Sequence, residues 1–88
     1  MVNAEKLARI FKLFSVEARI RIVQALKRRT MCVTELTSQL GISQEATSQH
    51  LRLLRDAGIV WFQKKGFHVY YSLDKRKMAL VHKAVSML

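Results

Sequence analysis

Apolar residues in the first half of the chain recur with the period of an α-helix. At the start they fall at positions i, i+3, i+4 and i+7, so the first helix has an apolar face made of Leu7, Ile10, Phe11 and Phe14. Capping residues and glycines divide the remaining pattern, because Ser, Thr, Asn and Asp favour helix starts and Gly favours helix ends. The sequence predicts five helices, with starts capped by Asn3, Ser15, Thr34, Ser43 and Asp74 and with stops at Gly41 and Gly58.

The period changes after the second of these glycines. The segments IVWFQKK and FHVYYSL are rich in β-branched and aromatic residues, and Gly66 between them suits a hairpin turn. The predicted order is α-α-α-α-β-β-α. The third and fourth helices, joined by the turn GIS, form a helix-turn-helix, and the hairpin forms a wing. We therefore expect a mainly α winged helix-turn-helix fold, with residues 1–88 as one domain for DNA binding and dimerisation.

The net charge of the chain indicates which class of molecule the protein binds. Sixteen Lys and Arg residues against six Asp and Glu give a formal net charge of +10 in 88 residues. This excess favours a polyanion, either nucleic acid or an anionic membrane surface. No apolar run approaches the ~20 residues of a membrane span, and charges interrupt the first segment where a signal peptide is apolar. Because the single Cys also indicates a reducing compartment, we expect a cytoplasmic protein with no membrane partner.

The fourth helix carries the candidate DNA-reading residues. Its leucines mark the inward side, and Thr47 and His50 are expected at the margin of that side. Gln and Ser can read base edges because they both donate and accept hydrogen bonds, and Arg52 can reach a phosphate or a guanine. Glu45 either accepts from a cytosine amino group or weakens non-specific binding. The predicted reading set is Ser43, Gln44, Glu45, Ser48, Gln49, His50 and Arg52.

The wing adds Lys64, Lys65 and His68 at or near its turn. Paired lysines suit contact with the phosphate backbone or the minor groove, as charges that carry no sequence code. They also suit an ordinary hairpin, whose lysines prevent edge pairing with other strands. We favour DNA contact for the lysines. For His68, DNA contact and a position in an ordinary hairpin are equally favoured.

Together these segments resemble the ArsR/SmtB family of bacterial and archaeal winged-helix repressors. The resemblance covers nearly the whole chain, and its strongest pieces are Arg19-Ile20-Arg21-Ile22, Ser43-Gln44, Ser48, His50-Leu51 and Tyr70-Tyr71-Ser72-Leu73. It implies a homodimer, built from the first and last helices, that binds double-stranded operator DNA and is released by an inducer. The last helix is apolar on several sides, as a helix covered by a partner would be. The expected dimer-interface residues are Leu7, Phe11, Met78, Val81, Val85 and Leu88.

The same resemblance raises the question of a metal sensor. Family members that sense metals often carry Cys-Val-Cys at the start of the third helix, whereas this chain has Cys32-Val33-Thr34 and no other Cys. A soft-metal site needs several thiolates. The family's second site uses Asp and His of the last helices, of which Asp74 and His82 remain. Cys32 and His82 are therefore weak candidates, no metal or other cofactor is expected, and Cys32 is interpreted as a small buried apolar residue.

These observations favour one function over two others. The leading hypothesis is a homodimeric, sequence-specific transcriptional regulator, a repressor of the ArsR type without the usual metal-sensing ligands. The alternative is a winged-helix architectural or protein-interaction module that binds nucleic acid without sequence preference. An enzyme is not expected, because the carboxylates are scattered and neither a nucleophile–base pair nor a phosphate-cradling loop is visible. No feature of the sequence identifies the inducer.

Overall fold

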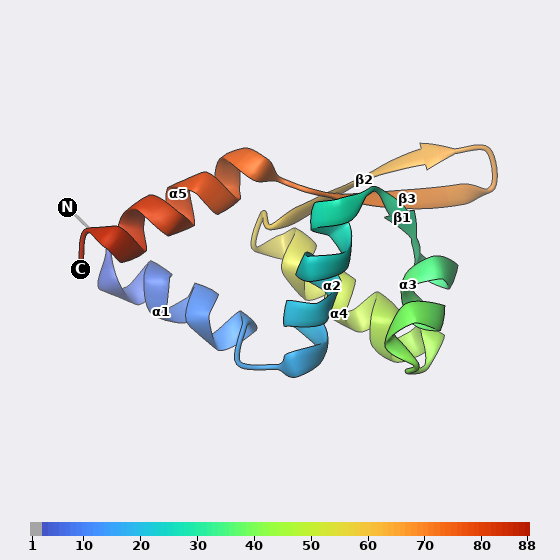
Figure 1. The fold of residues 1–88 in the computed structure, drawn as a ribbon, viewed down its shortest axis with the longest axis horizontal. Coiled ribbons are helices and arrows are strands. Elements are labelled where there is room, and N and C mark those ends of the chain that lie inside the picture. The colour runs from blue at the N-terminus through green and yellow to red at the C-terminus, as the bar shows by residue number, and fades with distance from the viewer. Residues whose placement is uncertain (1–2) are drawn as a thin grey trace.

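The computed structural model describes residues 3–88, so the first two residues of the expected domain lie outside the described part. It has the predicted element order with one further short strand before the third helix (Figure 1). The elements are α1 (Ala4–Leu13), α2 (Glu17–Arg28), β1 (Met31–Cys32), α3 (Val33–Leu40), α4 (Gln44–Asp56), β2 (Val60–Lys65), β3 (His68–Leu73) and α5 (Lys75–Ser86).

Three of the predicted helix caps are confirmed. The side-chain oxygen of Asn3 accepts a hydrogen bond from the backbone N–H of Lys6 at 3.1 Å, which begins α1. Ser43 caps α4 in the same way at 3.0 Å, and Asp74 caps α5 at 2.9 Å. Each cap satisfies an N–H group that has no partner inside its helix, so the short polar side chain fixes the residue at which the helix begins.

Two predicted caps are wrong. Ser15 donates its hydroxyl to the carbonyl of Lys12 at 2.7 Å and closes the end of α1, and Val16 occupies the cap position of α2 without a side-chain bond. Thr34 lies inside α3, whose cap residue is Cys32. A hydroxyl next to a helix start is thus ambiguous, since it can bond backward to a preceding carbonyl as easily as forward to an N–H group.

A three-stranded antiparallel sheet in the order β1-β3-β2 forms the wing and its base. The strand β1 is the element that the sequence did not predict. Met31 of β1 pairs with Tyr71 and is only 1% exposed, and the hydroxyls of Thr30 and Ser72 lie 2.8 Å apart just beyond this pair. The strand β1 therefore ties the wing to the helix-turn-helix.

The hydrophobic core lies between α2, α3, α4 and the start of β2. Its fully buried side chains include Ile22, Leu36, Leu51, Leu54 and Ile59. These residues hold the helix-turn-helix against α2 and the sheet, so burial of their apolar surface is the main stabilising contribution to this part of the fold.

The helices α1 and α5 lie beside each other at the end of the molecule opposite the hairpin tip (Figure 1). They carry little of the core: Leu7 is the buried residue of α1, and α5 has none. Among residues 3–88, no helix is both long and apolar enough to cross a membrane.

Candidate nucleic-acid interface

The angle between α3 and α4 is fixed at their shared turn. Gly41 ends α3 with a φ of +68°, a left-handed conformation that favours glycine. Thr47, which was expected at the margin of the inward side of α4, is fully buried. Its hydroxyl donates to the carbonyl of Ser43 at 2.9 Å and accepts from the hydroxyl of Thr37 on α3, also at 2.9 Å. A buried hydroxyl with both bonds made joins the two helices in one geometry.

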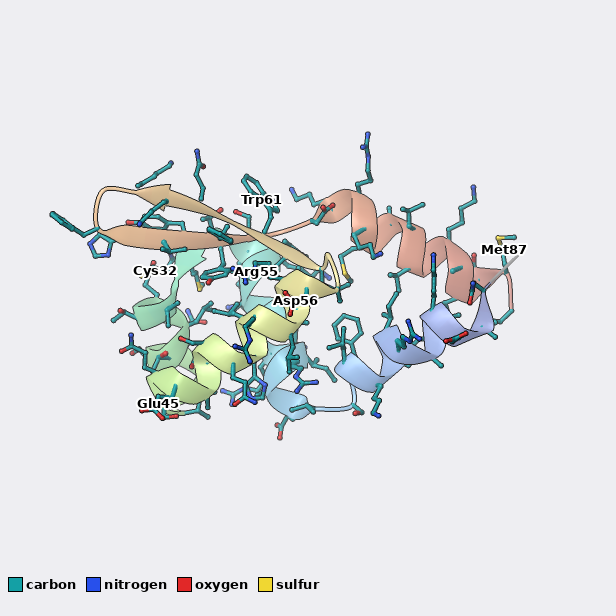
Figure 2. The ribbon with its side chains drawn as sticks, turned by 180° about the vertical axis from the view of Figure 1, so that it is seen from behind. Cys32, Glu45, Arg55, Asp56, Trp61 and Met87 are labelled. Carbon is teal, nitrogen blue, oxygen red and sulfur yellow. The ribbon has the colours of Figure 1, made fainter. Side chains whose placement is uncertain are left out.

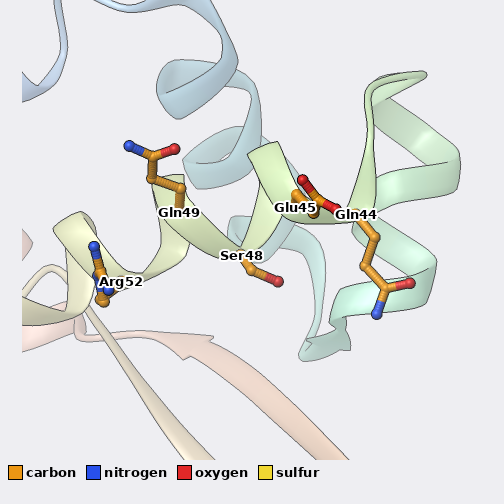
Figure 3. Close-up of a pocket in the computed structure, with 5 residues that line it drawn as sticks. All are labelled: Gln44, Glu45, Ser48, Gln49 and Arg52. Carbon is orange, nitrogen blue, oxygen red and sulfur yellow. The ribbon is translucent and has the colours of Figure 1, made fainter.

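The exposed side of α4 brings together five of the predicted reading residues. They line an open surface depression of about 650 Å³, shown in Figure 3 and called here the α4 face: Gln44, Glu45, Ser48, Gln49 and Arg52. Its amides, hydroxyl and guanidinium offer donors and acceptors in a row along one helix, as is needed to read base edges in a major groove. The hydroxyl oxygen of Ser43, the sixth predicted residue, is already bonded to the N–H of Ala46 as the cap.

His50 lies apart from the α4 face. The Nε of Arg19 on α2 donates to Nδ1 of His50 at 3.2 Å, and Nη1 of the same arginine donates to the carbonyl of Leu13 at 3.4 Å. The removal of His50 from solvent, and secondarily the positive charge of Arg19, lower the pKa of the imidazole below its usual range. His50 therefore supports the position of α4 against α2, and it presents no free Nδ1 to a ligand.

Arg21, the second arginine of the 19–22 motif, supports the other helix of the pair. Its guanidinium donates to the carbonyl of Leu40 at 3.2 Å and to that of Gln39 at 3.3 Å. Both carbonyl groups belong to the last turn of α3, where a carbonyl has no N–H partner inside the helix. A cation at this negative end of the helix dipole is stabilising. The two arginines therefore hold both helices of the helix-turn-helix against α2.

The three wing residues point to both faces of the hairpin. Lys65 pairs with His68, and Lys64 pairs with Val69. Because successive residues of a strand point to opposite faces, Lys64 shares a face with Phe62, and Lys65 shares the other with His68. Lys64 and Lys65 are both exposed, so they place positive charge on both sides of the tip, and the exposed His68 lies beside Lys65.

Arg55 belongs to this region and was missed in the sequence-based prediction. Its guanidinium lies 5.1 Å from the centre of the Phe62 ring, a cation–π contact that joins α4 to β2. Figure 2 shows Arg55 on α4 beside the wing. The signal was present in the sequence, since Arg55 follows Arg52 by three residues and so continues the same stripe of the helix.

Cys32 stands at the start of α3 and is half-buried, so it is less buried than the small buried apolar residue that was expected. Its backbone N–H donates to the Glu35 carboxylate at 3.2 Å, and Arg29 forms an ion pair with the same carboxylate at 2.7 Å. The Arg29 side chain first, and then the Cys32 backbone N–H, lower the pKa of Glu35. His82 is exposed on α5. Within residues 3–88, no three His, Cys, Asp or Glu side chains gather as a metal site would require.

The expected dimer-interface residues differ in exposure. Phe11, Val85 and Leu88 are 46%, 41% and 79% exposed, so they are available to a partner. Met78 packs in part against the core, and Val81 is half-buried. Leu7 is only 6% exposed, so its side chain already serves packing inside one chain.

The fold and the α4 face define a winged helix-turn-helix protein. Residues 17–61 match the family model described as "Bacterial regulatory protein, arsR family", and the chain belongs to this family. The match spans α2, both helices of the helix-turn-helix and the start of β2, which are the elements that the core residues and Arg19 and Arg21 hold together. The family is one of regulatory proteins and not of enzymes.

Several proteins are similar along most of the chain. The "Transcriptional repressor SmtB homolog" of Synechocystis sp. is 31% identical over 84 residues, which cover 96% of this chain and 64% of that protein. The "Cadmium resistance transcriptional regulatory protein CadC homolog" of Staphylococcus aureus is 37% identical over 84 residues, or 93% of this chain and 69% of the relative. The solved structure of reduced HlyU from Vibrio cholerae has a TM-score of 0.80 at 32% identity and covers 97% of this chain and 90% of the other. The chain thus spans less than two thirds of the Synechocystis relative.

Proposed function

We propose that this chain is a sequence-specific regulator of transcription, a repressor that binds double-stranded operator DNA as a homodimer. The observation that carries the proposal is the α4 face, where polar side chains with both donors and acceptors stand exposed on the second helix of a helix-turn-helix. In this arrangement Gln44, Ser48 and Gln49 read base edges in the major groove, and Arg52 contacts a guanine or a phosphate. A protein with this role is expected to act in the cytoplasm.

The charge distribution supports a nucleic-acid partner. The net charge is +10, and Arg52, Arg55 and Lys64 are exposed along α4 and the adjoining side of the wing. The first turn of α4 adds N–H groups at the positive end of its helix dipole, which stabilise a phosphate. Glu45 is the one carboxylate on the α4 face, and it suits a cytosine amino group or weakens binding to sites without one.

Exposed apolar surface on α1 and α5 supports a homodimer. A groove of about 380 Å³ runs between these helices, lined on one side by Leu7 and Ile10 and on the other by Leu80 and Met87. Large apolar side chains around it remain in solvent in a single chain, which costs free energy that a second copy would recover. Two-fold symmetry would place two copies of α4 about 34 Å apart, in successive major grooves.

Selection of bound duplexes from a genomic pool, followed by footprinting, tests the proposal. We expect protection of a pseudo-palindrome with a steep salt dependence. Arg52→Ala should weaken specific binding by about 1–3 kcal/mol. Lys65→Ala, the matched control, should weaken binding to all DNA sequences by about the same amount. Salt-dependent binding with no sequence preference would instead indicate a non-specific architectural module.

The same selection tests the absence of a metal signal. Cys32 and Glu35 stand at the start of α3, and the ion pair with Arg29 holds the Glu35 carboxylate. We therefore expect Zn(II) and Cd(II) to leave operator binding unchanged. Release by either ion at a concentration equal to that of the protein would contradict this part of the proposal.

A further inference from the structure

Phe67 stands at the tip of the wing with its side chain wholly in solvent. It is 103% exposed, more than any other large apolar residue within residues 3–88. Gly66 and Phe67 form a two-residue turn, because Lys65 and His68 are paired directly before and after them. The ring is therefore carried on a short turn whose strands are paired up to its base.

The fold itself gives no reason for a phenylalanine here. Gly66 has a φ of +62° and so supplies the left-handed residue of the turn, while Phe67 has no positive φ. A two-residue turn with glycine first accepts many residues in second place, commonly small polar ones. Since the Phe67 ring packs against nothing, it contributes no burial to the fold, and its whole apolar surface is free to contact a partner.

The surroundings of Phe67 indicate what it contacts. Lys64, Lys65 and His68 flank it, and no Asp or Glu occurs from residue 57 to residue 73. The contact between Arg55 and Phe62 joins the hairpin to α4, so the wing and the α4 face belong to one connected part of the molecule. A partner must therefore offer negative charge on both sides of an apolar slot, next to the surface that α4 binds. The minor groove of duplex DNA, with phosphates on both walls and stacked bases between them, meets these conditions.

We propose that Phe67 inserts as an apolar wedge between two base pairs of the minor groove adjoining the segment bound by α4. This inference rests on the proposed function and adds a second source of sequence preference to it. Lys64 and Lys65 contact the phosphates on the two walls, and the ring partly unstacks one base step and bends the duplex. Pyrimidine–purine steps are the easiest to unstack, so the wedge selects them without a hydrogen bond to any base.

Duplexes of the selected operator with 2-aminopurine at successive flanking positions test the wedge, since this base brightens when it is unstacked. The protein is compared with Phe67→Ala, which removes the ring, and with Phe67→Leu, which keeps an apolar wedge. We expect brightening at one step in each flank with the wild type and with Phe67→Leu, and none with Phe67→Ala. Phe67→Ala should also bind about tenfold more weakly and lose its preference for TA over AA at that step.

The thermal unfolding midpoint of Phe67→Ala should equal that of the wild type, because the ring packs against nothing in the fold. Selective operator binding without brightening at any step, and with equal affinity of Phe67→Ala, would overturn the wedge and leave the proposed function intact. Failure of the wild type to select any duplex would overturn both. Tighter Phe67-dependent binding to phosphatidylglycerol vesicles than to the operator would overturn the wedge in favour of a membrane contact.

Discussion

His50 illustrates how a single distant contact can change the role of a residue. By its position on α4 it stands among the candidate reading residues, yet Arg19, 31 positions earlier in the chain, donates to its Nδ1 and draws it toward α2. The bond requires an imidazole that is unprotonated at Nδ1, and both burial and the arginine charge lower the pKa of His50. The residue is thus neutral in the folded protein at neutral pH.

The lowered pKa of His50 predicts a loss of stability in mild acid. The unfolded chain binds a proton at this residue near its ordinary value of about 6.5, before the folded chain does, so protons favour unfolding as the pH falls below that value. We expect the free energy of unfolding to decrease from pH 7 to pH 5, and His50→Gln to reduce that decrease. Urea unfolding at several pH values measures both, with the exposed His82→Gln as the matched control. An equal pH dependence in His50→Gln and in the wild type would contradict the prediction.

At the scale of elements, the predictable features were those set by neighbouring residues. Asn3, Ser43 and Asp74 cap the helices that follow them because each needs only a backbone N–H three residues ahead. The start of α3 was not predicted although the Glu35 carboxylate accepts from the N–H of Cys32 only three residues away, because the cap residue is a cysteine and not Ser, Thr, Asn or Asp. The pairing of β1 with the distant strand β3 also fixes this start.

The same distinction explains why β1 was missed while the hairpin was predicted. Each strand of the hairpin has six residues, enough for its composition and its turn glycine to be recognised. The strand β1 has two, so no alternation can appear, and it forms because the free edge of β3 lies next to it. Similarly, the helical period predicts Thr47 at the margin of the inward side of α4. Its hydroxyl is instead fully buried, where it accepts a hydrogen bond from Thr37 of the neighbouring helix.

The hydroxyl pair of Thr37 and Thr47 predicts a measurable coupling between α3 and α4. Thr47→Val keeps the shape but removes a buried donor and acceptor, so it should destabilise the protein by about 1–2 kcal/mol. Thr37→Val should lower the free energy of unfolding less in the Thr47→Val protein than in the wild type, because its hydrogen-bond partner is already absent. A double-mutant cycle in urea gives the coupling, and Thr34→Val, an exposed threonine inside α3, is the matched control. A coupling energy near zero would show that the pair does not join the helices.

At the scale of the whole molecule, the chain has two functional ends joined by one core. The hairpin tip lies at one end and the α1–α5 pair at the other, while the helix-turn-helix stands between them (Figure 1). The exposed Phe67 and the exposed apolar residues of α5 thus belong to different surfaces, which are expected to have different partners. The exposed apolar residues of α1 and α5 lie outside the core, so a partner can cover them without disturbing the buried residues.

This separation predicts that dimerisation can be removed while the fold is kept. Phe11 and Val85 are exposed in a single chain, so Phe11→Glu with Val85→Glu should leave the unfolding of a monomer cooperative. Each charge would be buried without a partner in a dimer, which is strongly unfavourable. Sedimentation equilibrium should then change from a dimer to a species near the chain mass of 10.2 kDa.

Operator binding by the double variant should fall by more than tenfold, because one half-site must then be bound without the other. The matched control is Ile20→Glu, at a position on α2 that is 42% exposed, and it should remain dimeric. A double variant that stays dimeric would show that other surfaces form the interface. A wild type that sediments as a monomer and still protects a full pseudo-palindrome would show that both half-sites can be occupied without this contact.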